Sequence, residues 1–303
     1  MFTGQNSMST GVNEGQRAFI LDFDGTITVK DTIDVLANYG IEWQARKGMN
    51  MKGIWEEIVA SYERHFEDHV RGYKHAKEDR KTLEQEIAYY RGLREVEERS
   101  FGRVSDSGLF KGIGKEAWEG AGREAVEKGD VVVRKGFKEF VEMLKENERI
   151  WGIVSVNFSG SFIRGVVGAS AGLGKDVVEV LANSSDERGA LVGPRSGEKT
   201  LTTSDAKLAS MKDLLHSWRS TGWWDTSNPV YIGDSGTDIE CLTEPGVVGI
   251  VMADNAESGL METMKRIGVE VVHIGEYEES RGNKRYWARD FEEILQSPLL
   301  SLK

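Results

Sequence analysis

The sequence predicts an α/β fold, a doubly wound parallel sheet with an inserted all-helical domain. In the second half of the chain, short apolar runs alternate with amphipathic segments of ordinary helix length, which is typical of parallel strands joined by helices. Residues 31–128 instead contain no proline and carry apolar residues at a spacing of three to four, which predicts helices alone. We therefore expect a sheet-containing core that is interrupted, after its first strand, by a helical cap.

The first expected strand is the apolar run AFILDF at residues 18–23, because a short continuous apolar run is typical of a strand buried in a parallel sheet. Within the insertion, amphipathic helices are predicted over residues 32–43, 51–66 and 81–101. The Gly- and Ser-rich stretch 100–115 breaks the helical pattern. It is either a loop over a pocket or a plain connection between helices.

The second half of the chain supplies the remaining strands and helices. Strands are predicted within residues 149–156, 176–183, 229–234 and 247–253. Helices are predicted within residues 131–147, 159–168, 204–218, 236–244 and 289–297. The resulting domain division is a disordered tail over 1–16, a core over 17–30 and 129–303, and a cap over 31–128.

Composition limits the classes of partner. The 39 Lys and Arg residues against 50 Asp and Glu give a formal charge of −11 without a basic block, so nucleic acid is not expected as a partner. No apolar run approaches the roughly 18 residues that a membrane span needs. The single cysteine, Cys241, excludes an intrachain disulfide and fits a reducing compartment. We expect a soluble cytoplasmic protein; the sequence does not indicate its oligomeric state.

Polar residues follow three of the predicted strands at the point where each strand ends. Asp22 and Asp24 end the first strand, Ser155 ends the strand within 149–156, and Asp234 ends the strand within 229–234. In an open parallel sheet, ligands bind at the carboxyl ends of the strands. Two carboxylates side by side are costly unless a cation lies between them. The pattern therefore indicates a cation-dependent site at this edge of the sheet.

Two of these segments carry a family resemblance. Asp22-Phe-Asp-Gly-Thr26 and Gly233-Asp-Ser-Gly-Thr-Asp238 resemble the first and last motifs of the haloacid dehalogenase-like superfamily. The resemblance implies phosphoryl transfer through an aspartyl-phosphate, with Asp22 as nucleophile and Asp24 as general acid and base. It also implies a Mg²⁺ ion held by Asp22, Asp234 and the backbone carbonyl of Asp24, since Mg²⁺ prefers oxygen ligands.

The same resemblance implies roles for further residues around the phosphoryl group. Ser155 would bind a phosphoryl oxygen, Asn157 would help to line the pocket, and Asp238 would orient the lysine or a metal-bound water. A lysine would balance the charge of the transferred group. Lys207, at a predicted helix start, fits this role better than its neighbours Lys199 and Lys212, which remain alternatives.

A helical insertion after the first motif resembles the subclass I cap of the phosphoserine phosphatase-like branch. In that branch a glutamate binds the substrate amine at the position that Asp31 occupies here, although Asp31 could equally cap the first helix of the insertion. Arg103, in the stretch 100–115, could meet an anionic part of the substrate. The run Val-Asn-Phe-Ser after Ser155 departs from the Gly-Gly-Phe of serine-specific enzymes, so phosphoserine itself is not indicated.

The resulting prediction is a phosphoric monoester hydrolase that acts on a small-molecule phosphate ester with Mg²⁺ as cofactor. Caps that close over a site exclude water and favour small substrates. The alternatives are a phosphomutase or another phosphotransferase of the same superfamily, or a non-catalytic protein that uses the fold for interaction. The presence of both Asp22 and Asp234 favours the enzyme.

Overall fold

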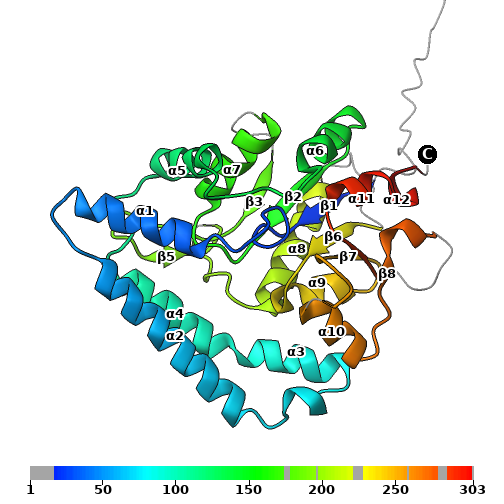
Figure 1. The fold of residues 1–303 in the computed structure, drawn as a ribbon, viewed down its shortest axis with the longest axis horizontal. Coiled ribbons are helices and arrows are strands. Elements are labelled where there is room, and N and C mark those ends of the chain that lie inside the picture. The colour runs from blue at the N-terminus through cyan, green and yellow to red at the C-terminus, as the bar shows by residue number, and fades with distance from the viewer. Residues whose placement is uncertain are drawn as a thin grey trace, which may run out of the picture.

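The computed structural model describes residues 17–173, 178–195, 197–220, 228–257, 259–278 and 285–301; the tail predicted over 1–16 lies outside them. Its centre is a seven-stranded sheet with the order β3-β2-β1-β6-β7-β9-β8, and every pair of neighbouring strands is parallel (Figure 1). The doubly wound α/β fold predicted from the sequence is thus confirmed.

The strands are short, and the central ones are fully buried. Their bounds are β1 Phe19–Leu21, β2 Trp151–Val154, β3 Glu179–Leu181, β6 Val230–Gly233, β7 Val248–Met252, β8 Val272–His273 and β9 Arg285–Ala288. A separate antiparallel pair, β4 Ser184–Ser185 and β5 Leu191–Val192, follows β3. The five strands predicted from apolar runs all form, whereas β8 and β9 were not predicted.

The direction of winding reverses between β1 and β6. From β1 the chain proceeds through β2 to β3 on one side, and then returns to β6 and continues outward through β7 on the other. Phe19, Ile20 and Leu21 of β1 pair with β2 on one edge and with β6 on the other. Such a reversal leaves a crevice at the carboxyl ends of the two strands, where ligands of open α/β sheets bind.

Helices occupy the long connection between β1 and β2. They are α1 Ile33–Ala45, α2 Lys52–Gly72, the 3₁₀ turn η1 Lys77–Asp79, α3 Leu83–Gly92, α4 Arg94–Ser107, α5 Lys115–Lys128 and α6 Phe137–Glu146. Figure 1 shows α2, α3 and α4 as an arm that lies apart from the sheet along one side of it, with α3 running back toward α10. By contrast, α5 packs closely on α7, with Gly165 against the backbone of Glu119. The cap boundary at residue 128 remains a prediction.

The other helices cover the two faces of the sheet. They are α7 Gly160–Ala171, α8 Ser204–Ser220, η2 Gly236–Asp238, α9 Ile239–Thr243, α10 Gly259–Arg266, η3 Ile274–Glu276, α11 Phe291–Leu295 and α12 Pro298–Ser301. Alternate residues of β1 point to opposite faces. Leu21 packs in the cluster that includes residues of α6, α7 and α11, whereas Ile20 packs with residues of α8, α9 and α10.

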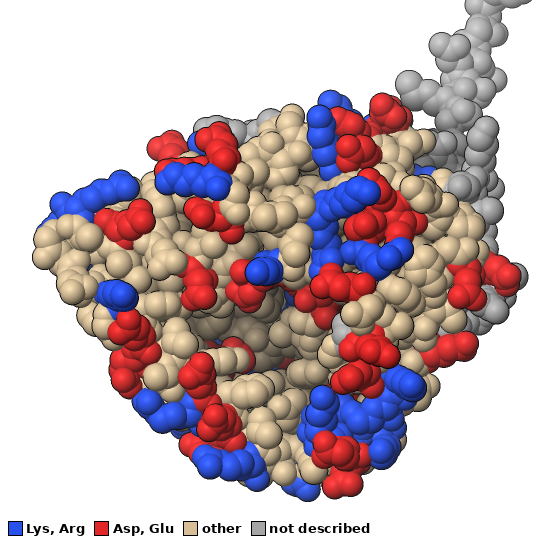
Figure 2. Space-filling model, in the orientation of Figure 1, with Lys and Arg blue, Asp and Glu red and all other residues tan. Residues whose placement is uncertain are grey.

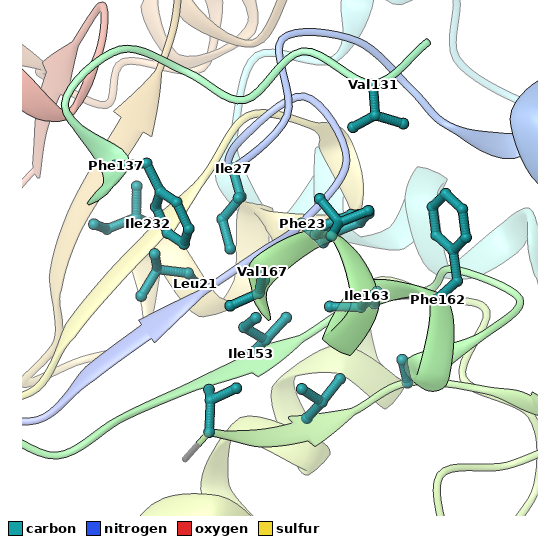
Figure 3. Packing of buried hydrophobic residues seen from close by; sticks show 14 of the residues in the cluster. Leu21, Phe23, Ile27, Val131, Phe137, Ile153, Phe162, Ile163, Val167 and Ile232 are labelled. Carbon is teal, nitrogen blue, oxygen red and sulfur yellow. The ribbon is translucent and has the colours of Figure 1, made fainter. Parts of the chain in front are cut away.

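Figure 3 shows the first of these two layers at close range. Leu21, Ile153 and Ile232 come from the three neighbouring central strands and face Phe137 and Val167 of the covering helices, and all five side chains are buried. Burial of large apolar side chains stabilises the fold by roughly 1.5–3 kcal/mol for each one. The strand ends that carry the polar residues are therefore fixed on a rigid base.

Two of the helix predictions need correction. Residues 81–101 form two helices, α3 and α4, that meet at Leu93, rather than one. The change of direction lets α3 contact α8 while α4 packs along α2. Of the two alternatives for the stretch 100–115, the loop over a pocket is wrong and the connection between helices is confirmed, because α4 continues to Ser107, ends at the left-handed Gly108 and is joined by a short segment to α5 at Lys115. Helix α10 was not predicted.

Among the residues that the structure describes, no helix is both long enough and apolar enough to cross a membrane.

Candidate active site

Three charged side chains form the buried centre of the candidate site. Lys207 of α8 lies between Asp22, which follows β1, and Asp238, at the end of η2, with its Nζ 2.9 Å from Asp22 Oδ1 and 2.7 Å from Asp238 Oδ1. Lys207 is wholly buried and Asp22 is 4% exposed. Burial lowers the pKa of Lys207, but the two carboxylates outweigh it and hold the pKa above its ordinary value. The ammonium group is therefore permanently charged.

Asp238 is saturated with hydrogen-bond donors. Oδ1 accepts from the Tyr231 hydroxyl at 2.6 Å besides its contact with Lys207. Oδ2 accepts from the backbone N–H groups of Asp234 and Ser235 and from the Ser235 hydroxyl, at 3.0 to 3.2 Å. Because both oxygens are occupied, Asp238 positions Lys207 and the loop after β6 rather than facing the crevice.

Asp234 lies across the crevice from Asp22 and packs directly against the loop after β1. Its Oδ1 accepts a hydrogen bond from Thr26 Oγ1 at 2.9 Å. Gly25 adopts φ +72°, and a Cβ atom there would lie 2.2 Å from Asp234 Oδ2, so only glycine fits. Burial, with repulsion from Asp238, raises the pKa of Asp234 to about 7. Burial likewise raises the pKa of Asp22 well above its usual range, and Asp238 adds to this.

Asp24 is held by three donors from two segments. Oδ1 accepts from the Thr32 N–H at 2.9 Å and from the Thr32 hydroxyl at 2.6 Å, and Oδ2 accepts from Asn157 Nδ2 at 2.8 Å. Burial, with repulsion from Asp31, raises the pKa of Asp24 to about 6, and these hydrogen bonds oppose the rise. The carboxyl group is thus fixed in place and titrates near neutrality, which suits proton transfer in both directions.

Ser155 and Asn157 follow β2 and are both buried. The Ser155 hydroxyl accepts a hydrogen bond from the Asn157 N–H at 3.2 Å. Of the competing lysines, Lys199 is exposed, and Lys212 is half-exposed and paired with Glu244 at 2.8 Å. Only Lys207 of the three candidates contacts the carboxylates of this site.

A cavity of about 270 Å³ lies between these carboxylates and the helical arm, and Figure 2 shows the molecule hollowed there, with acidic side chains around the hollow and inside it. A second cavity of about 660 Å³ adjoins it and shares Asp31 and Asp234 with it. The lining of the first cavity is Asp22, Asp24, Gly25, Asp31, Ile33, Tyr62, Glu97, Phe101, Val156, Asn157, Thr202, Asp234, Ser235 and Thr237.

Of the two charged residues expected to contact substrate, Asp31 lines the cavity and Arg103 does not. Asp31 lines both cavities, and its carboxylate also accepts a hydrogen bond from the Ile33 N–H at 2.7 Å, so it faces the cavity and caps the start of α1 at the same time. Arg103 is not brought to either cavity. It lies on α4 with its Nη1 3.3 Å from His65 Nδ1 of α2.

The chain is similar in sequence to several known proteins. No family model matches the chain. A CTO1 family protein of Schizosaccharomyces pombe is 28% identical over 271 residues, which cover 86% of this chain and 89% of that protein. Cold tolerance protein 1 of Saccharomyces cerevisiae is 25% identical, covering 87% and 88%. The mitochondrial bifunctional TH2 protein of Arabidopsis thaliana is 27% identical, and the matched part is only 42% of its length.

Superposition on solved structures identifies the fold of this chain. A phosphoserine phosphohydrolase-like protein of Francisella tularensis superposes with a TM-score of 0.50 at 14% identity, covering 92% of this chain and 98% of that one. Cytosolic 5′-nucleotidase IIIB bound to cytidine superposes with a TM-score of 0.51 at 14% identity, covering 83% and 78%. The chain has a haloacid dehalogenase-like fold. The resemblance seen in the sequence is confirmed at the level of fold.

In this haloacid dehalogenase-like fold, the carboxylates at the point where the sheet reverses direction, between β1 and β6, fit a divalent cation. Ligand oxygens of Asp22, Asp234 and Asp238 lie within 4.8 Å of one another. Asp22 Oδ1 is buried and, beyond its ion contact with Lys207, accepts no hydrogen bond from the residues that the structure describes. Since Asp238 is saturated by donors, Asp22 and Asp234 are the side chains left to hold a hard cation such as Mg²⁺. Such a cation would also offset the repulsion that raises the pKa of both groups.

Several residues of the site were not predicted. Thr32 and Thr202 belong to no recognisable spacing, and Thr32 could have been noticed only as a hydroxyl next to Asp31. Arg134 lies far along the chain, yet its guanidinium donates to the Gly25 carbonyl at 2.9 and 3.1 Å and pairs with Asp254. It fixes the left-handed turn after Asp24. Tyr62 and Glu97 were expected only as parts of amphipathic helices.

Proposed function

We propose that the protein is a Mg²⁺-dependent phosphatase that hydrolyses a small-molecule phosphomonoester through an aspartyl-phosphate on Asp22. The observation that carries the proposal is the buried Asp22–Lys207–Asp238 contact beside Asp234, at the core side of a small cavity and at the point where the sheet reverses direction. A buried charge network of this kind is costly for stability, so a catalytic role is the better explanation for it.

In the first step, a carboxylate oxygen of Asp22 attacks phosphorus and forms a P–O bond while the bond to the leaving oxygen breaks. Asp24, protonated, donates its proton to that oxygen, so that the alcohol departs neutral. Its pKa of about 6 leaves a usable protonated fraction near neutral pH. Thr32 and Asn157 keep the carboxyl group aimed at one position, which spares the cost of ordering it during the reaction.

In the second step, the Asp24 carboxylate takes a proton from water, and the oxygen of that water attacks phosphorus. The bond between phosphorus and Asp22 breaks, inorganic phosphate leaves, and Asp24 again holds the proton with which the cycle began. Lys207 keeps Asp22 ionised when it departs. Thr237 lines the cavity and would offer a hydroxyl group to the phosphoryl oxygens, and the proposal gives the same role to Ser155, which is buried at the end of β2. Mg²⁺ held by Asp22 and Asp234 would supply further charge stabilisation for those oxygens.

The test is phosphate release from a panel of small phosphomonoesters with purified protein and Mg²⁺. We expect release by the wild type, its loss in EDTA, and its loss in Asp22→Asn, because an amide is a far poorer nucleophile than a carboxylate. Asp213→Asn, a change of the same kind at an exposed position of α8, should keep full activity. Equal activity in Asp22→Asn would exclude the aspartyl-phosphate route, and release that persists in EDTA would exclude the metal.

A further inference from the structure

We propose that the cavity above Asp22 selects phosphomonoesters whose alcohol carries a positive charge and no carboxylate, with Glu97 and Tyr62 as specificity-determining residues. The inference rests on the proposed phosphatase function and specifies its substrate class. The phosphoryl group must meet Asp22 at the core side of the cavity, so the alcohol extends toward the opposite wall. That wall is formed by the start of α1 and by α2 and α4 of the arm, which contribute Ile33, Tyr62, Glu97 and Phe101.

The charge of this wall has a single sign. Within the described part of the chain, the residues that line the cavity include the carboxylates of Asp31 and Glu97 but no Lys, Arg or His. Lys207 lies behind Asp22 and is engaged by two carboxylates. Arg103, the cation expected from the sequence to meet an anionic group, is turned toward His65 instead. The basic side chains that line the adjoining cavity do not line this one, so a carboxylate on an alcohol confined to the cavity above Asp22 would meet only like charge at its wall.

Glu97 is half-buried at this wall, and no Lys, Arg or His among the described residues pairs with it. Its Oε1 accepts a hydrogen bond from the Tyr62 hydroxyl at 2.9 Å. Burial raises the pKa of Glu97 to about 6, and no basic side chain opposes the rise. A partly buried carboxylate that lines a cavity and lacks a basic partner is stabilised by a cation that enters the cavity. This makes Glu97 the natural counter-ion of the alcohol.

Aromatic rings complete the cation environment. Tyr62 of α2 and Phe101 of α4 both line the cavity. Each ring is held by another ring, Tyr62 stacked on Phe66 and Phe101 edge-on to Phe158. A fixed ring whose face is open to the cavity attracts an ammonium group at little entropic cost. Carboxylates and aromatic rings on one wall favour a cation more than either a neutral or an anionic group.

The experiment compares kcat/KM for phosphocholine with that for 3,3-dimethylbutyl phosphate, its neutral carbon isostere, and for O-phosphoserine. The wild type should prefer phosphocholine over the isostere by about tenfold or more, and should hydrolyse O-phosphoserine least. Glu97→Gln should lose most of that preference. Glu95→Gln, an exposed change on the same helix, should keep it. Equal kcat/KM for phosphocholine and its isostere in the wild type would overturn the inference while leaving the phosphatase function intact.

Binding gives an independent measurement that does not require turnover. Calorimetry on Asp22→Asn with Mg²⁺ should show tighter binding of phosphocholine than of 3,3-dimethylbutyl phosphate, and Glu97→Gln in that background should reduce the difference. This result would support the inference about charge even if no phosphomonoester were hydrolysed, in which case only the proposed function would fail. Equal affinity for the two ligands, or binding of neither, would overturn the inference.

Discussion

Lys207 stands out at the scale of single residues because it is wholly buried between two carboxylates. Removing one partner of a buried ion pair leaves an uncompensated charge in a medium of low dielectric constant. Lys207→Met should therefore lower the free energy of unfolding by about 3–5 kcal/mol. Lys212→Met removes an exposed ion pair with Glu244 and should cost about 1 kcal/mol or less.

Chemical denaturation of the two variants and the wild type measures this difference. Activity distinguishes the lysines as well, since Lys212→Met should keep turnover and Lys207→Met should lose it. A Lys207→Met variant as stable as Lys212→Met would mean that Asp22 and Asp238 are not held as ionised groups by this contact.

Glu97 gives a prediction that depends on pH. Its pKa in the folded protein is raised to about 6 from 4.5, so the folded state binds the proton more tightly than the unfolded state does. The stability associated with this proton is complete below about pH 4.5 and is lost as the pH rises through about 6, by roughly 2 kcal/mol in total. Glu97→Gln is neutral throughout and escapes the loss. Its melting temperature relative to wild type should therefore be higher at pH 8 than at pH 4.5.

Differential scanning fluorimetry of wild type, Glu97→Gln and Glu95→Gln at the two pH values measures this change. Glu95 is exposed and paired with Arg99, so Glu95→Gln should show no such gain. A difference between Glu97→Gln and wild type that is independent of pH would show that Glu97 is not desolvated in the folded state.

The sequence located single residues well where strand geometry forced their position. Asp22 and Asp234 were expected together because the ends of parallel strands converge, and the structure brings them together. Thr32, Arg134 and Glu97 could not be placed, because their positions depend on how distant helices and loops pack. Periodicity shows that a helix has an apolar face, but not which polar residue at its border will line a cavity.

At the scale of elements, the arm contacts the core through α3 and the start of α4. Arg91 pairs with the buried Glu240 of α9, Arg94 pairs with Asp205 of α8, and the Ser204 hydroxyl donates to Glu240 at 2.8 Å. Both acidic partners lie within two residues of Asp238 or Lys207 along the chain. The position of the arm is therefore coupled to the segments that carry the candidate catalytic groups.

Tyr90 and Gly236 show how tight this junction is. A Cβ atom on Gly236 would lie 2.0 Å from the Tyr90 ring, which no real contact allows. Gly236→Ala should push α3 away from the loop after β6 and reduce kcat/KM at least tenfold by displacing the arm. Tyr90→Ala removes the obstructing ring, so Gly236→Ala combined with Tyr90→Ala should recover part of the loss.

Steady-state kinetics of the two single variants and the double variant measures the coupling. Additive effects in the double variant would contradict the idea that Gly236 matters through its contact with Tyr90. They would point instead to a requirement for glycine within the loop itself.

The prediction of elements succeeded where the pattern was strong. The five buried strands were recognisable as apolar runs between turn residues, and α8 as a long amphipathic segment. The break between α3 and α4 was not, because the apolar spacing continues across it and the change of direction is imposed by contact of α3 with the core. Strand β9 escaped notice because RYWA is short and mixes polar with apolar residues.

At the scale of the whole molecule, the fold places acidic groups together where the sheet reverses direction. Their burial and repulsion lower the stability of the folded state, and a bound cation would remove this loss. Burial, with repulsion from Asp238, raises the pKa of both Asp22 and Asp234. The net charge of −11 adds a general preference for cations over anions near the protein. The molecule without metal is thus less stable than its hydrophobic core alone would make it.

Mg²⁺ should therefore raise the melting temperature of the wild type. At a concentration about 100 times its dissociation constant, a ligand that binds only the folded state raises the free energy of unfolding by roughly 2.7 kcal/mol and the melting temperature by several degrees.

Asp234→Asn should differ from the wild type both in EDTA and in Mg²⁺. In EDTA it should melt above the wild type, because one repelled carboxylate is gone, and Mg²⁺ should no longer shift its melting temperature. Asp68→Asn, at an exposed position of α2, should respond to Mg²⁺ as the wild type does. A full shift in Asp234→Asn would place the ion elsewhere on this acidic protein, and the carboxylates at the point where the sheet reverses direction would then need another explanation.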